Sequence, residues 1–273
     1  MGPPVRLLSS VSPSEIVQYR TLRRSQEQIL QGIFVADGEK VVRRLLNSSV
    51  AIVSFLLTRE WYEKLLNTEP RFQECRSDAF LADRALLQQI VGYRLHQGIM
   101  AIGKVPDQVS LMALLQRRSA PFRIVALDGL MNSENVGVIV RNSAGLGVDG
   151  ILVGETSSSP YLRRAVRNSM GAVFSLPVLH VENLATTLRA LRDAGTRVIA
   201  AHGRATTGIL DIDFRGNICI VFGNEESGVS PDVLGASSVH VAIPMHGQVD
   251  SLNVASAAAV FLYEADRQRR SGR

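Results

Sequence analysis

The later half of the chain alternates short apolar runs with segments of helical spacing. The apolar runs are four to six residues long, as is typical of buried strands, and a polar turn follows most of them. Strands are therefore expected at residues 122–127, 150–153, 173–178, 197–201, 218–222 and 239–243. Helices are expected at residues 135–146, 161–170, 183–194 and 255–263. Apolar strands that alternate with helices predict an α/β fold, with a parallel sheet between layers of helices.

The earlier part of the chain shows the same alternation on a smaller scale. Strands are expected at residues 33–36, 50–57 and 97–105, and helices at residues 38–46, 59–66 and 83–91. The composition changes near Ser119, where a proline follows shortly. The sequence therefore predicts two domains, a small α/β domain at residues 1–119 and a larger one at residues 120–273.

The N-terminal end is predicted to carry a basic helix. Residues 1–12 are expected to form a loose arm, after which Ser14 is expected to cap a helix that runs through Gln28. One face of this helix holds Arg20, Arg23 and Arg24. Such a cluster is usually solvated, but in a basic domain it is also a candidate for contact with phosphates.

Two polar loops follow apolar strands near the C-terminus. The run at residues 218–222 leads into Gly223, Asn224 and Glu225, and the run at residues 239–243 leads into a polar turn at residues 246–250. Asp250 or Ser251 is expected to cap the last helix. Because ligands of open α/β sheets bind outside the carboxyl ends of the strands, these two loops are expected to line the active site.

The composition is that of a globular protein, with 46% hydrophobic and 20% charged residues. No apolar run is long enough to cross a membrane, and no secretory signal pattern is present, so a cytoplasmic protein is expected. An organelle transit segment stays open, because the first fourteen residues contain no acid. The two cysteines and five histidines show no disulfide or metal-ligand spacing, so no metal is expected.

The net charge of +5 is unevenly distributed. Residues 1–119 hold 16 Lys and Arg against 11 Asp and Glu, whereas residues 120–273 hold 14 of each. A basic first domain suggests a polyanionic partner such as RNA, with ordinary surface charge as the alternative. On the predicted helix at residues 161–170, Arg163, Arg164 and Arg167 are candidates for RNA phosphates, for a neighbouring subunit or for a solvated face.

Three motifs together resemble those of the SpoU/TrmH class of RNA ribose 2′-O-methyltransferases. They are the Asn-x-Gly-x-x-x-Arg pattern from Asn135 to Arg141, the GNEESG sequence from Gly223, and the IPM and SLN sequences from Ile243 and Ser251. Their order and spacing make the signal specific. The segment FVADGEKVV from Phe34 resembles, more loosely, the opening of the N-terminal substrate-binding domain of this class, which is related to ribosomal proteins that bind kinked RNA.

The resemblance implies a trefoil knot in the second domain, a homodimer, and S-adenosylmethionine as the methyl donor. For donor binding it points to strand-end positions, where glycine permits close approach of the backbone. These residues are Gly223, Ile243 and Leu252, to which the neighbouring loops add Gly203 and Met245. For the acceptor ribose and catalysis it points to Arg141, Asn135, Ser251, Asn253 and Glu225.

The roles of these residues follow from what ribose methylation requires. A 2′-hydroxyl must be held in line with the donor methyl group and must lose its proton. Arg141 lies six residues after Asn135, so both are expected to face one region, where the arginine orients the hydroxyl and stabilises negative charge. Glu225 is expected to tie the loops together, and Asn253 has a second interpretation as a local hydrogen-bond partner in the first turn of its helix.

Other functions stay open at this stage. A non-catalytic RNA-binding assembly factor on the same fold, a tRNA ribose methyltransferase and a base methyltransferase are the alternatives. The N-terminal domain favours rRNA over tRNA. Asn142 and Glu226 depart from the residues common at these positions, but neither change removes a proposed catalytic group.

Overall fold

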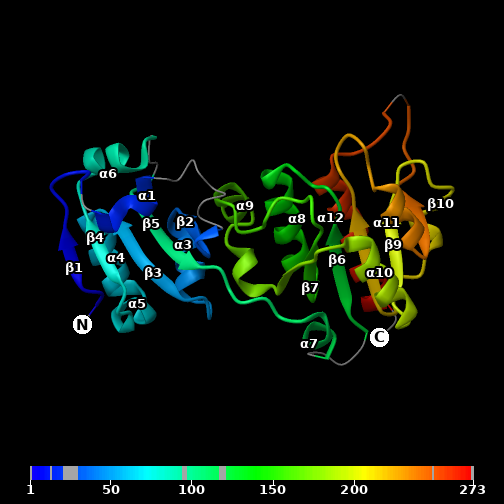
Figure 1. Ribbon diagram of the computed structural model, residues 1–273, viewed down its shortest axis with the longest axis horizontal. Coiled ribbons are helices and arrows are strands. Elements are labelled where there is room, and N and C mark those ends of the chain that lie inside the picture. Colours follow the sequence, from blue (N-terminus) through cyan, green and yellow to red (C-terminus); the bar gives the residue numbers. More distant parts are fainter. Residues whose placement is uncertain are drawn as a thin grey trace. The chain divides into compact units, whose positions relative to one another are not determined.

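The computed structural model describes residues 2–12, 14–20, 30–93, 97–116, 121–247 and 249–271. The chain forms two compact units, each built on its own sheet (Figure 1). Unit 1 comprises Met1–Asp107 and Tyr161–Phe174, and unit 2 comprises Gln108–Pro160 and Ser175–Arg273. The boundary expected near Ser119 lies at residues 117–120, outside the described part of the chain.

Unit 2 contains the predicted parallel sheet, in the order β10-β12-β9-β11-β6-β7-β8. All of its recorded strand pairs are parallel. The strands are β6 (Arg123–Leu127), β7 (Gly150–Val153), β8 (Val178–His180), β9 (Arg197–Ala201), β10 (Thr207–Gly208), β11 (Ile218–Phe222) and β12 (Val239–Ala242). Because β9 lies between β11 and β12, the loops that leave these three strands begin side by side at one edge of the sheet.

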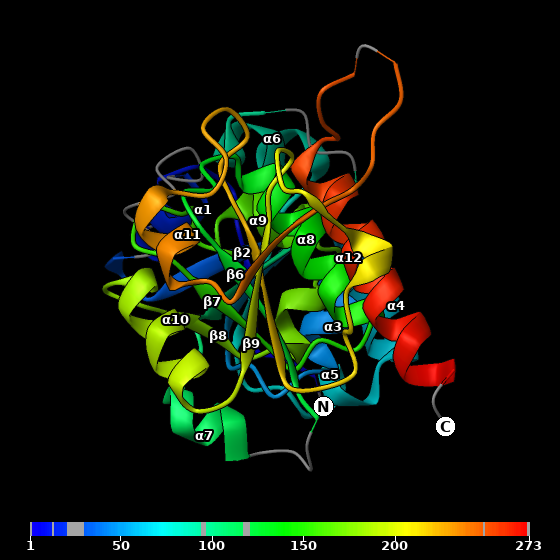
Figure 2. The ribbon, with the colours of Figure 1, turned by 90° about the vertical axis from the view of Figure 1, so that its right-hand side faces the viewer.

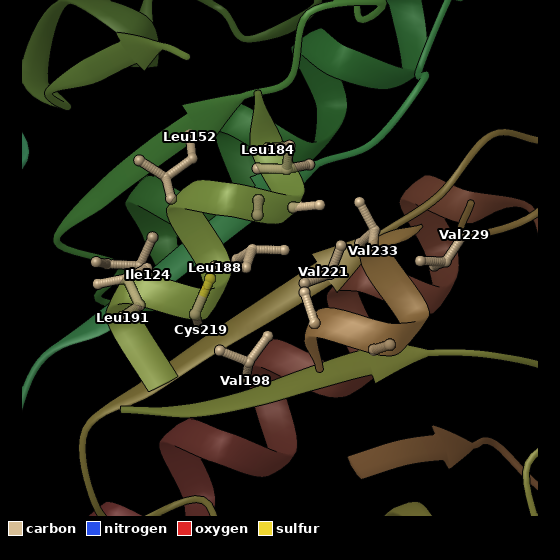
Figure 3. Close-up of a cluster of buried hydrophobic side chains, with 14 of the residues drawn as sticks. Ile124, Leu152, Leu184, Leu188, Leu191, Val198, Cys219, Val221, Val229 and Val233 are labelled. Atoms are coloured by element: carbon tan, nitrogen blue, oxygen red, sulfur yellow. The ribbon is translucent and has the colours of Figure 1, made fainter. Parts of the chain in front are cut away.

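Helices cover both faces of this sheet (Figure 2). One face is covered by α7 (Leu111–Gln116), α10 (Leu184–Asp193) and α11 (Pro231–Ala236), and the other by α8 (Ser133–Gly145) and α12 (Val254–Ser271). Figure 3 shows the first of these cores, where Ile124, Val198 and Cys219 of the strands meet Leu188 of α10. Successive strand residues point to opposite faces, so each strand also supplies the second core, in which Phe222 contacts Phe261 of α12 edge to face.

One strand of unit 2 was predicted in the wrong place. Residues 173–178 were expected to form a strand, but Ala172–Ser175 is a 3₁₀ helix and β8 starts only at Val178. Val173 and Phe174 are buried for another reason, since Phe174 stacks on Phe34 of unit 1 with ring centroids 5.1 Å apart. The short elements α11 and β10 were not predicted, because six and two residues are too few for a periodic pattern.

Unit 1 is a mixed sheet in the order β1-β4-β3-β5-β2, with β5 antiparallel to both of its neighbours. The strands are β1 (Val5–Leu7), β2 (Ile33–Asp37), β3 (Ile52–Leu57), β4 (Asp78–Leu81) and β5 (Ile99–Lys104). The helices are α1 (Val17–Arg20), α3 (Glu39–Leu46), α4 (Arg59–Thr68), α5 (Pro70–Glu74), α6 (Arg84–Val91) and α9 (Arg163–Asn168). The small α/β domain is therefore present, and α9 joins it from the later half of the sequence.

The expected loose arm at residues 1–12 is wrong for its central part. β1 pairs with β4 in parallel, and Leu8 N donates to Leu81 O at 2.8 Å. All three β1 residues are exposed, so the strand leaves no pattern of burial in the sequence. The helix expected from Ser14 begins as a 3₁₀ turn at Ser14–Ile16 and continues as α1, while its residues 21–28 lie outside the described part. The sequence prediction also omitted α5 and β4.

The C-terminal helix α12 is fastened near its end to the starts of two strands. Arg269 donates to the carbonyl oxygens of Phe122 at 2.9 Å and Gly216 at 2.8 Å, and Gln268 Oε1 accepts from Phe214 N at 2.9 Å. Arg123, only 2% exposed, donates to Ala265 O, and burial lowers the pKa of its guanidinium to about 10. These contacts fix the position of α12, and with it the residues at its N-terminal end.

Two classes of feature are not found in the described residues. None of their helices is long and apolar enough to cross a membrane. No group of three or more His, Cys, Asp or Glu residues in the same part of the chain could hold a metal ion.

Candidate active site

A cavity of about 860 Å³ opens at the carboxyl edge of the unit 2 sheet. Its lining comes mainly from residues 201–204 after β9, 222–228 after β11, and 241–243 and 250–254 after β12. The loop that leaves β12 rises above this edge before it returns to α12 (Figure 2). The cavity therefore lies where ligands of parallel α/β sheets bind, and where the sequence placed it.

The loop after β11 makes a tight reversal that depends on Gly223. A Cβ atom added to Gly223 would lie 2.2 Å from Val229 N, because the chain folds back on itself there. Asn224 holds the turn, since its Oδ1 accepts from Glu226 N at 2.9 Å and its Nδ2 donates to Gly129 O at 2.7 Å. Glu225 is thereby presented at the tip of the turn.

Three polar side chains from distant parts of the sequence meet beside this cavity. Asn135 Nδ2 donates to Glu225 Oε1 at 2.7 Å, across 90 sequence positions. Asn253 Nδ2 donates to Asn135 Oδ1 at 3.2 Å, across 118 positions. The structure therefore brings one residue of each predicted motif into a single hydrogen-bonded cluster, which we call the Asn135–Glu225–Asn253 cluster.

Asn253 also caps α12. Its Oδ1 accepts from the backbone N–H of Ala255 at 2.9 Å and of Ser256 at 3.4 Å. The predicted caps, Asp250 and Ser251, are thus wrong, because the helix begins only at Val254. The alternative interpretation of Asn253 as a local hydrogen-bond partner is correct, and it holds together with the contact to Asn135.

The five residues predicted to bind a cofactor all line the cavity: Gly203, Gly223, Ile243, Met245 and Leu252. Ser251 lines it as well. Ala257 and Phe261 also lie on the cavity wall, although neither was predicted as a site residue. They follow Asn253 at spacings of four and eight residues, and this helical repeat was a signal that could have identified them.

Arg141 lies elsewhere in this chain. It is exposed on α8 and does not line the cavity. Six residues correspond to a rotation of about 240° around a helix, so Arg141 and Asn135 point in different directions. The shared face expected from their spacing is therefore absent within one chain.

The arginines proposed to contact RNA are in different situations. Arg20 is exposed on α1, whereas Arg23 and Arg24 lie outside the described residues. Arg164 and Arg167 are exposed on α9. Arg163 is engaged within unit 1, where its Nη1 lies 3.1 Å from Asp37 Oδ2 and 2.8 Å from the Tyr93 hydroxyl.

The contacts of Arg163 form a compact polar group. The Tyr93 hydroxyl donates to Asp37 Oδ2 at 3.0 Å, and the guanidinium of Arg163 lies over the Tyr93 ring, 4.6 Å from its centroid. Burial, and next the negative charge of Asp37, raise the pKa of Tyr93 well above its ordinary value. The hydroxyl therefore stays protonated as a donor, and Arg163 serves to hold α9 within unit 1.

The chain is similar in sequence to known RNA methyltransferases. The chain matches the model of the SpoU rRNA Methylase family over residues 123–263. It is similar to RlmB, a 23S rRNA (guanosine-2′-O-)-methyltransferase of Burkholderia sp, with 33% identity over 222 residues, or 77% of this chain and 87% of the relative. It is 31% identical over 250 residues to an uncharacterized tRNA/rRNA methyltransferase of Mycobacterium tuberculosis, covering 87% of this chain and 82% of the relative.

Solved structures show the same similarity. The SpoU methyltransferase AviRb from Streptomyces viridochromogenes, in complex with the cofactor AdoMet, superposes with a TM-score of 0.81. The match covers 95% of this chain and 100% of that chain, with 26% sequence identity. The similarity thus extends over both units, beyond the part that the family model covers.

The glycine at the start of the β11 loop provides a test of the local geometry. Gly223→Ala should lower the free energy of unfolding by about 1–3 kcal/mol, because the added methyl group meets backbone that cannot move aside. Gly235→Ala is the matched control, since Gly235 is exposed on α11 with open space around it. Urea unfolding followed by circular dichroism measures both changes, and equal midpoints for the two variants would contradict the close approach at Gly223.

Proposed function

Because the chain belongs to the SpoU rRNA Methylase family, we propose that it transfers a methyl group from S-adenosylmethionine to a ribose 2′-hydroxyl of ribosomal RNA. The observation that carries this proposal is the Asn135–Glu225–Asn253 cluster beside the cavity. The rRNA assignment is supported by the similarity to RlmB, a 23S rRNA 2′-O-methyltransferase. The protein would act in the cytoplasm, where bacterial ribosomes are assembled.

The residues of the cavity fit the proposed cofactor. A volume of about 860 Å³ accommodates a nucleoside joined to an amino acid. Gly203 and Gly223 line the cavity without a side chain, so a ligand can approach their backbone closely, and the carboxylates of Glu225, Glu226 and Asp250 suit the positive sulfonium and ammonium groups. Gly203, Gly223, Ile243, Met245 and Leu252 would hold the cofactor.

The chain's own groups would position the acceptor. When bound, the cofactor supplies a methyl group on positively charged sulfur. Asn135, Ser251 and Asn253 would orient the ribose so that its 2′-oxygen faces that methyl group. Glu225 holds the Asn135 amide in one orientation. Arg141, supplied by a second copy of the chain, would orient the hydroxyl and stabilise the negative charge that develops as the hydroxyl proton leaves.

The choice of acceptor atom is tested with a modified RNA. A large-subunit rRNA fragment that accepts methyl groups should lose all acceptance when the target ribose is replaced by 2′-deoxyribose, because the oxygen nucleophile is gone. Transfer of radiolabelled methyl from S-adenosylmethionine measures the reaction. Continued methylation of the deoxy substrate would identify the acceptor as a base and refute ribose methylation.

We also propose that unit 1 binds RNA and that the basic residues at its N-terminal end take part. The support is the net +5 charge of residues 1–119 and the resemblance of its opening segment to an RNA-binding domain. Deleting residues 1–119 would not test RNA binding alone, because it would also remove Phe34, the ring on which Phe174 stacks in unit 1. Point substitutions are therefore preferable.

Replacing Arg20, Arg23 and Arg24 together by Gln should weaken RNA binding and make it less dependent on salt. Each lost phosphate contact lowers the slope of log K against log salt by about 1. Filter binding at several salt concentrations measures the slope. Replacing Arg59, Arg76 and Lys104 by Gln removes the same charge from exposed positions of unit 1 and serves as the control. Equal losses in both variants would show that only net charge matters.

The resemblance implies a homodimer, and the position of Arg141 supports this proposal. Arg141 belongs to the predicted acceptor site, yet it is exposed on α8 and does not line the cavity of its own chain. On the neighbouring α12, Val260 is 39% exposed and Tyr263 is 62% exposed, a pair of apolar side chains one turn apart. A second copy packed on this α8–α12 face would cover them and bring Arg141 to the partner's cavity.

Complementation between two inactive variants tests this arrangement. Arg141→Ala lacks the arginine, and Asn253→Ser lacks the amide that contacts Asn135 but keeps an oxygen to cap α12. After subunit exchange, half of the dimers are mixed and each has one intact site, so activity should recover to about a quarter of wild type. No recovery, with exchange verified by native mass spectrometry, would mean that Arg141 serves its own chain.

The trefoil knot implied by the resemblance stays a proposal as well. The contacts that fasten α12 to Phe122, Phe214 and Gly216 would keep a threaded C-terminal segment from slipping out.

A further inference from the structure

The described residues that line the cavity include more negatively than positively charged side chains. Glu225, Glu226 and Asp250 contribute three carboxylates, and Arg204 is the only lysine or arginine among the described lining residues. A cavity of this kind suits a ligand that is mainly cationic but carries one anionic group. Arg204 is the residue to which that anionic group would bind.

Arg204 lies in the loop that leaves β9. It follows β9, the strand between β11 and β12, so its loop begins between the two loops that carry the predicted motifs. His202 N donates to Val241 O at 2.9 Å, which holds the start of this loop beside β12. The next residue, Gly203, lies against the loop before α12, where an added Cβ would be 3.7 Å from Asp250 O.

The guanidinium of Arg204 is available for a ligand. The side chain is exposed, and it makes no hydrogen bond or ion pair with the described part of the chain. Other arginines of the same unit are used internally: Arg197 donates to Asp213 O at 3.2 Å, and Arg192 to Ala236 O at 3.3 Å. Five N–H donors in a planar fork match a carboxylate well.

We propose that Arg204 binds the α-carboxylate of the methionine portion of S-adenosylmethionine and so determines which end of the cofactor lies at the β9 loop. The inference rests on the proposed function, which supplies the cofactor. The sulfonium and ammonium groups are positive, and the three carboxylates of the cavity favour them. The α-carboxylate is the one anionic group of the cofactor, and Arg204 is the one lysine or arginine that the described lining residues offer to it.

A role for Arg204 in holding an RNA phosphate is less consistent with its surroundings. An RNA phosphate bound to Arg204 would lie in the cavity with Glu225, Glu226 and Asp250, which would repel its charge, whereas the acceptor ribose is itself uncharged. A small ligand with both signs of charge avoids this repulsion.

The experiment compares two ligands that differ only in the carboxylate, S-adenosylmethionine and its decarboxylated analogue. Calorimetry gives the Kd of each for wild type, Arg204→Met and Arg204→Gln. The ratio of the two Kd values should shift by roughly fivefold toward the decarboxylated ligand in both variants. A change of this size lies between the effect of losing an exposed ion pair and that of losing a charge-assisted hydrogen bond inside a protein. Affinity for the decarboxylated ligand should stay near the wild-type value, which also verifies that the variants are folded.

Arg189→Met is the matched control, because Arg189 is exposed on α10 and does not line the cavity. It removes the same charge and should leave the ratio unchanged. An unchanged ratio in the Arg204 variants would overturn the proposal, and if RNA binding weakened instead, Arg204 would be a phosphate contact. Failure of the wild type to bind either ligand would refute the proposed function itself.

Discussion

The candidate site depends on a hydrogen-bonding constraint at Asn253. The first backbone N–H groups of α12 need an acceptor, and Asn253 Oδ1 accepts from Ala255 and Ser256. The side-chain nitrogen of Asn253 is then left to donate, so Asn135 must present its oxygen to it and turn its own nitrogen toward Glu225. One helix cap thereby sets the orientation of the whole Asn135–Glu225–Asn253 cluster.

The cap at Asn253 can orient Asn135 and Glu225 because the sheet and α12 bring these distant segments together. The order β12-β9-β11 starts three loops at one edge, and Arg269 and Gln268 fix the far end of α12. The result is a cavity lined by Gly203 and Gly223, by three carboxylates and, among the described residues, by a single arginine, Arg204. In the proposed arrangement, S-adenosylmethionine, with two positive groups and one carboxylate, and the acceptor ribose would be held by these loops together, and this agreement connects the fold to methyl transfer.

Much of this arrangement could be predicted from the sequence, and the exceptions have physical causes. Runs such as residues 218–222 are buried on both faces, so their apolar character reports a strand directly. Residues 173–178 were wrongly predicted to form a strand, because Val173 and Phe174 are buried by packing in unit 1 and not by strand pairing. β1 left no signal because its side chains are exposed. The spacing between Asn135 and Arg141 also led to a wrong prediction, that both face one region, because six residues do not complete two turns of a helix.

The most direct test of the account is a map of ribose methylation across total RNA from cells with and without this gene. One or a few 2′-O-methyl groups of the large-subunit rRNA should disappear in cells without the gene and return when the wild-type gene is restored, but not with Asn135→Ala. An unchanged ribose map would contradict it. The loss of a base methyl group in its place would contradict it equally, because the cluster is assigned to a 2′-hydroxyl.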